Sequence, residues 1–268
     1  MNNAYLTRFF TKRVLIEKIF NEKFEKEEFI REVNENYAIL KQHYRNEFFF
    51  KSILFNKYLL GKYSLNTSVA LSEVAIGKSK ADFCIINRNK GMVFEIKTDL
   101  DNLDRLIYQI EDYYKVFSYV SVVTTENNYY PVWRVIKDYF PKVGIVVLTE
   151  NITLSERKKG ELNIKHLEYL SLFKLLRKSE YEELIRMKFD VPTEIRPVEH
   201  FKIFFSYFKK IKILDAQTMV FEILKKRVGL NEGKRLNVLP DPIRWIIYSA
   251  NLKSSQYNEI EYKFKSKD

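Results

Sequence analysis

Two short apolar runs joined by a polar loop constrain the fold of this chain more than any other part of its sequence. Both runs lie within residues 80–97, both are rich in β-branched and aromatic side chains, and the loop between them ends in Gly91. The pattern predicts a β-hairpin. Because alternate side chains of a strand share a face, Glu95 and Lys97 should point the same way, and strand pairing should bring Asp82 within reach of Glu95.

Two carboxylates that converge on one point form a site for a hard cation such as Mg²⁺, which takes one or two carboxylates together with water and substrate phosphate. A lysine beside them can orient or polarise a metal-bound water. A solvated strand face carries the same residue types, and the Glu-x-Lys pattern alone favours that simpler interpretation. The position of Glu95 favours a site, because it lies at the end of an apolar run, where functional side chains are often displayed.

Two helical segments beside the predicted hairpin carry polar residues of their own. Upstream, Glu47 is the lone acid in a strongly apolar helical stretch. Downstream, residues 103–117 repeat apolar side chains at helical core spacing. On that segment Arg105, Gln109 and Tyr113 recur every four residues and should form one polar stripe. These positions add a third carboxylate and a polar helix face to the pattern.

The order and spacing of these residues resemble the PD-(D/E)xK nuclease superfamily, in the form seen in RecB-like and Cas4-like nucleases. The positions that carry the resemblance are Glu47, Asp82, Glu95-Ile96-Lys97 and Gln109-xxx-Tyr113. More narrowly, the segments YRNE, SLNT, GKSKAD, EIKT and LDRL are similar to those of an uncharacterised family of small bacterial and phage proteins in that superfamily. The resemblance covers roughly residues 35–150, and Ala81 stands where the superfamily often has a proline.

The resemblance implies a mixed sheet flanked by helices and a metal site at the end of the hairpin. Mg²⁺, or Mn²⁺ in its place, would be bound by Asp82, Glu95 and the carbonyl oxygen of Ile96. Lys97 would position the attacking water, and Glu47 would add a further carboxylate from the first core helix.

Five residues are candidates for contacts with nucleic acid. The resemblance implies that Gln109 and Tyr113 lie near the scissile phosphate, and Arg105 belongs to the same helical stripe. Lys78 and Lys80 flank a turn beside the first aspartate. For these two lysines a phosphate contact and simple solvation both remain open.

Glu73 and Cys84 are further candidates with simple alternatives. Glu73 lies in the middle of a predicted strand, where metal binding and plain exposure are equally consistent with the pattern. Cys84 should share a face with Asp82, and a small packed side chain is the favoured role. As the single cysteine it excludes an internal disulfide framework and a Cys-only zinc or iron–sulfur site. This separates the chain from Cas4-like relatives, which add a cysteine-ligated cluster.

The charge of the chain favours a polyanionic partner. The net charge is +11 and the isoelectric point is near 9.4. Residues 155–268 hold 24 basic against 16 acidic side chains, which is +8 of that total. We expect this region to supply affinity for nucleic acid. No stretch approaches the ~20 apolar residues of a membrane span and no signal peptide is evident, so the expected compartment is the cytoplasm, without a membrane partner.

The pattern of elements divides the 268 residues into three regions. These are an N-terminal helical appendage (1–42), a core (43–154) and a basic helical region (155–268) that shows no clear strands and ends in a frayed polar tail (253–268). Strands are predicted at 69–76, 80–87, 92–97, 119–124 and 143–148, and helices at 103–117, 131–139, 167–186, 201–211 and 216–227, with a break at 191–197. This order predicts an α/β fold with a mixed, restriction-endonuclease-like sheet flanked by helices.

These observations lead us to expect a magnesium-dependent nuclease acting on DNA in bacterial or phage defence, recombination or repair. RNA remains open as a substrate, as does assembly into a homodimer or with a partner protein. The alternative is a catalytically inactive nuclease fold that binds nucleic acid or protein as a regulator. The presence together of Glu47, Asp82, Glu95 and Lys97 favours the enzyme. No GxxxxGK[ST] P-loop occurs, so an ATP-driven motor would have to come from another chain.

Overall fold

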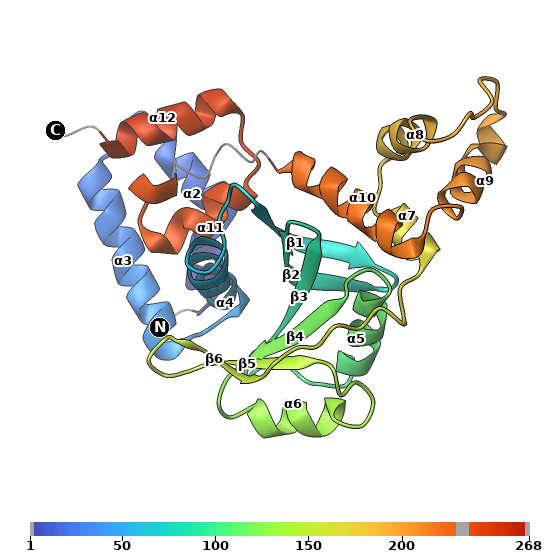
Figure 1. Cartoon of the computed structure of the whole chain (residues 1–268). Coiled ribbons are helices and arrows are strands. Elements are labelled where there is room, and N and C mark those ends of the chain that lie inside the picture. The colour runs from blue at the N-terminus through green and yellow to red at the C-terminus, as the bar shows by residue number, and fades with distance from the viewer. Residues whose placement is uncertain (1–2, 229–235, 266–268) are drawn as a thin grey trace.

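The computed structural model describes residues 3–228 and 236–265, and a mixed sheet of six strands lies at its centre (Figure 1). In spatial order the strands are β1 (Ser68–Ile76), β2 (Ser79–Asn87), β3 (Lys90–Lys97), β4 (Tyr119–Thr124), β5 (Gly144–Leu148) and β6 (Leu154–Lys158). The pairs β1–β2, β2–β3 and β5–β6 are antiparallel, and β3, β4 and β5 run parallel. The α/β class and the mixed sheet predicted from the sequence are confirmed.

β2 and β3 form the predicted hairpin, but its turn is shorter than the polar loop suggested. The strands are joined by a tight turn in which Arg88 has a φ of 51°, in the left-handed region. Gly91 lies inside β3, opposite Ile86, so its prediction as the end of the loop is wrong. A Cβ atom at Gly91 would lie 2.4 Å from the ring of Phe221 in α10 (Ile213–Arg227), and this close helix packing accounts for the glycine.

Different helices cover the two faces of the sheet (Figure 1). One core holds side chains of α5 (Leu106–Tyr114), α6 (Tyr129–Ile136), α7 (Tyr169–Lys174), α8 (Lys178–Arg186), α9 (Pro197–Phe208) and α10. The other holds side chains of α1 (Asn3–Phe9), α2 (Lys12–Ile19), α3 (Lys26–His43), α4 (Glu47–Leu54), the π-helix η1 (Phe55–Leu60), α11 (Asp241–Ser249) and α12 (Ser254–Lys265). Alternate strand residues supply the two cores, for example Val93 the first and Phe94 the second.

The N-terminal and C-terminal helices belong to the same layer. The ring of Phe264 in α12 lies 5.7 Å from that of Phe24 and 6.0 Å from that of Phe29, measured between centroids. The polar end that was predicted to fray is therefore a packed helix as far as Lys265, and residues 266–268 lie outside the described residues. The helix forms because its few apolar side chains recur at helical spacing and are buried.

Two other segments after residue 154 differ from the predictions. β6 lies where no strand was expected, and the predicted boundary between residues 154 and 155 falls inside it. Its sequence is polar because it is an edge strand with half-buried or exposed side chains, so the apolar run typical of a core strand is absent. The helix predicted over 167–186 is divided into α7 and α8. The predicted break at 191–197 is confirmed, and α9 begins at Pro197.

The helices of this protein are short. The longest in the described residues is α3, with 18 residues and charged side chains along its length. None of the helices that the structure describes is both long enough and apolar enough to span a bilayer.

Candidate functional site

A cleft of about 560 Å³ opens between the sheet and the helical layer. Asp82, Glu95 and Lys97 line it from the strands, and Glu47 and Lys51 line it from α4. Further parts of its wall come from residues 7–12, which include Phe10 and Lys12, and from α11, which supplies Trp245 and Ser249. The acids and the lysine singled out in the sequence therefore meet in one cavity.

A left-handed residue in β1 places one more acid beside Glu47 and Asp82, which line this cleft. Glu73 has a φ of 57°, a left-handed conformation that non-glycine residues rarely adopt and that costs of order 1–3 kcal/mol. The register of β1 and β2 places it opposite Asp82, and pairing is interrupted at this position. One carboxylate oxygen from each of Glu47, Glu73 and Asp82 lies within 4.8 Å of the other two. We call these three residues the acidic cluster; Glu73 is exposed and also lies beside Glu47 and Asp82, and metal binding by Glu73 stays a prediction.

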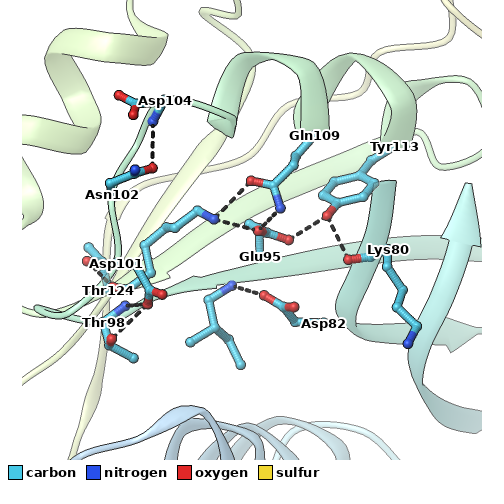
Figure 2. A network of polar contacts seen from close by, with 12 residues as sticks. Lys80, Asp82, Glu95, Thr98, Asp101, Asn102, Asp104, Gln109, Tyr113 and Thr124 are labelled. Carbon is cyan, nitrogen blue, oxygen red and sulfur yellow. Dashed lines mark hydrogen bonds and ion pairs between the residues drawn. The ribbon is translucent and has the colours of Figure 1, made fainter. Parts of the chain in front are cut away.

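Asp82 is placed where β2 begins to separate from β3. Its carboxylate accepts a hydrogen bond from the backbone N–H of Ile96 at 2.8 Å, beyond the last paired residues of the two strands (Figure 2). Burial, the charge of Glu95 and, to a smaller extent, that of Glu47 outweigh the lowering effect of the Ile96 N–H and of Lys51, and the pKa of Asp82 is raised to about 8. A cation beside this carboxylate would relieve that cost.

Glu95 is held by three side chains and is 1% exposed. Its Oε1 accepts hydrogen bonds from Lys97 at 2.9 Å and from Gln109 at 2.6 Å. Its Oε2 accepts one from the Tyr113 hydroxyl at 2.6 Å (Figure 2). Lys97 also donates to the Gln109 carbonyl oxygen at 2.9 Å, which closes the network. The structure thus brings Asp82 together with the other members of the acidic cluster, while Glu95 lies beside them in a separate network.

The predicted polar stripe runs from the surface into the core. α5 begins at Leu106, so Arg105 is its exposed N-cap residue, and Gln109 is half-buried. Tyr113 is fully buried, and its hydroxyl also lies 3.0 Å from the backbone carbonyl of Lys80. Burial and the charge of Glu95 raise the pKa of Tyr113. Gln109 and Tyr113 position Glu95 and Lys97, and the Tyr113 ring is not at the surface of the cleft, where a nucleic-acid contact was expected.

The acidic cluster has a buried lysine that the sequence analysis missed. The Lys51 ammonium contacts Glu47 and lies 2.5 Å from an oxygen of Glu73, whose other oxygen is 3.0 Å from the Lys80 ammonium. Burial lowers the pKa of Lys51, but the charges of Glu47 and Glu73 outweigh it and the net shift is upward. The available signal was the spacing of Glu47 and Lys51, four residues apart on one helix.

The remaining predicted contacts with nucleic acid lie away from the cleft. Arg105 and Lys78 are exposed and do not line it. The backbone N–H of Lys78 is bound to Asp112 of α5 at 3.0 Å, so this residue serves the turn between β1 and β2.

The donors of the acidic cluster fit a hard divalent cation. Carboxylate oxygens are the ligands that Mg²⁺ and Mn²⁺ prefer, and three of them converge here, one from Asp82, whose negative charge is unfavourable. The same residues would not suit a soft metal, because the one cysteine, Cys84, is buried in the core behind the sheet.

Among known families, the model described as bacteriophage P4 protein cII matches residues 40–239. The matched span runs from the end of α3 to the segment before α11 and contains all six strands, the acidic cluster and the Glu95 network. No match was found among curated proteins or among solved structures.

Proposed function

The chain belongs to the bacteriophage P4 protein cII family, and we propose that it is a metal-dependent nuclease that hydrolyses phosphodiester bonds, with DNA as its substrate. The observation that carries the proposal is the position of Lys97, whose ammonium is held by Glu95 and Gln109 in the wall of a cleft that also contains Asp82. The order of these residues resembles the PD-(D/E)xK nuclease superfamily, and their convergence in one cleft supports that resemblance.

The acids of the cleft would hold the cofactor. Asp82, with Glu95, Glu47 and the Ile96 carbonyl, would bind Mg²⁺ or Mn²⁺. A bound ion of this kind stabilises charge on the phosphate and the leaving oxygen and lowers the pKa of a water molecule.

Lys97 would orient the attacking water. An ammonium group has three N–H donors, and Lys97 uses two of them on Glu95 and Gln109, which leaves one for a water or a phosphate oxygen in the cleft. The Gln109 amide is bonded to both Glu95 and Lys97, and the Tyr113 hydroxyl donates to the Oε2 atom of Glu95. Because Glu95, Lys97 and Tyr113 are buried and the network bonds them together, the lysine is held in one orientation before substrate arrives.

A second function is favoured by one specific observation. Three of the acids around the cleft are already neutralised by lysines without any metal: Glu47 by Lys51, Glu73 by Lys51 and Lys80, and Glu95 by Lys97. A self-compensated centre of this kind is also compatible with a nuclease fold that has lost its chemistry and binds nucleic acid, or a protein partner, as a regulator. The net charge of +11 supports a nucleic-acid ligand for either function.

The two functions are separated by a cleavage assay. Purified protein is incubated with linear and circular DNA, single- and double-stranded, and with RNA, in Mg²⁺, Mn²⁺ or EDTA. We expect cleavage of DNA with either metal and none in EDTA. Binding without cleavage in every condition would favour the regulator instead.

Variants at Asp82 and Lys97 test whether the activity belongs to this cleft. Asp82→Asn and Lys97→Ala should each reduce cleavage by at least about 100-fold, as expected for a group that binds the cofactor or moves a proton. In metal-free buffer Asp82→Asn should melt at the same temperature as the wild type or higher, because its buried carboxylate is repelled by Glu95. The control is Lys57→Ala, an exposed lysine just after α4. Equal cleavage by Asp82→Asn and wild type would assign the activity to another site.

A further inference from the structure

Lys51 lies among the acids of the cleft although it belongs to none of the motifs that resemble the nuclease superfamily. It follows Glu47 by one turn of α4 and is 7% exposed. Its ammonium contacts Glu47 and lies 2.5 Å from Glu73, so it bridges two of the three carboxylates of the acidic cluster. A lysine buried to this degree keeps its charge because both partners are acids.

The acids around the cleft differ in whether a lysine neutralises them. The ion pairs are Glu47 with Lys51, Glu73 with Lys51 and Lys80, and Glu95 with Lys97. Within residues 3–228 and 236–265, Asp82 has no ion pair, and its carboxylate accepts the Ile96 N–H. Asp82 is therefore the carboxyl group of the cluster that no ammonium holds, and it is available as a ligand for an incoming cation.

The size of the acidic cluster limits how many cations it can hold. One oxygen atom from each of its three carboxylates lies within 4.8 Å of the other two. Two-metal sites hold their ions about 3.5–4 Å apart, so a group of this size offers two cation positions at most. The ammonium of Lys51 already lies between Glu47 and Glu73, and a second divalent ion there would face its positive charge at close range.

We propose that Lys51 is the resident cation of the acidic cluster: it takes the position of a second divalent ion, so that the protein binds one divalent ion, at Asp82. This inference rests on the proposed metal-dependent function and specifies the number of ions. Lys51 acts as a positioning residue. It holds Glu47 and Glu73 by charge and leaves the chemistry of water activation to the single ion and Lys97.

Counting bound ions tests the proposal without an activity assay. Protein stripped of metal is titrated with MnCl₂ in a calorimeter. We expect one Mn²⁺ per chain for the wild type and two for Lys51→Met, because removal of the ammonium frees one oxygen of Glu47 and one of Glu73 for a second ion. Lys57→Met, which removes an exposed lysine from the following π-helix, is the matched control and should bind one. Two ions in the wild type, or one in Lys51→Met, would overturn the proposal.

Loss of Lys51 removes the ammonium that bridges Glu47 and Glu73, so the variant has to be checked for folding in both metal states by circular dichroism. Lys51→Met that folds only when Mn²⁺ is present supports the proposal, since the ion then replaces the ammonium. Lys51→Met that stays unfolded at saturating Mn²⁺ overturns it, because the lysine then serves the fold in a way that a cation cannot replace.

The same titrations separate this inference from the proposed function. One ion in both the wild type and Lys51→Met would remove the role of Lys51 and leave a metal-dependent nuclease standing. No ion in either protein would overturn the metal-dependent function, and the inference with it. Asp82→Asn should bind no ion while Lys51 is present, and binding equal to wild type would move the ion away from Asp82 and overturn the inference alone.

Discussion

The Tyr113 hydroxyl lies beneath the site, 2.6 Å from Glu95, with its ring completely buried. In Tyr113→Phe the Oε2 atom of Glu95 loses the hydrogen bond from this hydroxyl, and water reaches the buried position poorly. We expect a loss of about 1–3 kcal/mol in the free energy of unfolding, as for a hydrogen bond to a charged group. Because Glu95 and Lys97 are bonded to each other, cleavage should also fall by at least about tenfold. Urea unfolding and initial cleavage rates measure the two effects.

A matched tyrosine on the same helix provides the control. Tyr108 of α5 is 68% exposed, so Tyr108→Phe should leave both stability and cleavage within error of the wild type. If Tyr113→Phe loses stability but cleaves at the wild-type rate, the hydroxyl serves the core and does not position Glu95.

Among individual residues, the sequence predicted the positions of those whose side chains simply alternate between the two faces of a strand. Asp82, Glu95 and Lys97 line one cleft because strand geometry fixes which side chains share a face. Glu73 could not be assigned, since its entry into the acidic cluster depends on a single left-handed φ that no alternation pattern contains. Lys51 was missed because a lone lysine in an apolar helix usually lies on the solvent-exposed side of that helix. Only the tertiary fold shows that Lys51 is buried between two acids.

Among the elements, the turn between β1 and β2 depends on one acid of α5. Asp112 accepts hydrogen bonds from the Lys78 N–H at 3.0 Å and the Ser79 hydroxyl at 2.8 Å, and its other oxygen lies 2.6 Å from the Lys115 ammonium. Gly77 in the turn has a φ of 61°, and a Cβ atom there would lie 2.3 Å from the Asp112 carboxylate. The turn and the helix are thereby locked together.

Replacement of Asp112 should give a pH-dependent loss of stability. Burial raises the pKa of Asp112, but the hydrogen bonds from Lys115, Ser79 and Lys78 outweigh it and hold the pKa below its usual value. The stabilisation is therefore complete above the unfolded-state pKa of about 4 and is lost as the pH falls further. Asp112→Asn should cost about 1–2 kcal/mol at pH 7, and the difference from wild type should shrink below pH 4. Urea midpoints from pH 7 to pH 3 measure it, and a difference that stays constant with pH would contradict the role of the charge.

The helices and strands that could be predicted are those whose own sequence repeats apolar residues at helix or strand spacing. The bounds of β4 match the prediction at both ends, because its apolar run is buried on both sides. β6 and α12 were not predicted as such, since one is a polar edge strand and the other has only three buried apolar residues among twelve. Their structure depends on partners far along the chain, which a local pattern does not contain.

For the whole molecule, the two cores make the C-terminal region inseparable from the sheet. Phe221 of α10 stacks on Phe117 at 5.3 Å in one core, and Trp245 of α11 lies 5.1 Å from Phe83 in the other. A truncation after Asn151 removes both partners and β6. It should abolish cooperative unfolding rather than leave a folded core with weaker affinity for DNA. Thermal melting followed by circular dichroism tests this, and a cooperative transition in the truncated chain would contradict it.

Charge reversal tests the basic region while the fold stays intact. Lys209 and Lys210 are exposed just after α9, next to the rings of Phe205 and Tyr207. If they contact phosphates, Lys209→Glu with Lys210→Glu should weaken DNA binding and reduce the slope of log affinity against log salt by about 0.9 per lost contact. The control is Lys23→Glu with Lys57→Glu, which changes the net charge equally at exposed positions elsewhere. Equal losses in both pairs would mean that only the overall charge matters.

Because α11 supplies one wall of the cleft, the cleft is completed only after the acids that it contains have been synthesised. β1 to β5, the acidic cluster and Lys97 all precede residue 149, whereas Trp245 and Ser249 complete the cavity from a helix that starts at Asp241. Ribosomes add about 5–20 residues per second, and chains fold from the N-terminus as they emerge. A nascent chain therefore carries the acidic cluster and Lys97 for several seconds before α11 emerges and closes this wall of the cavity.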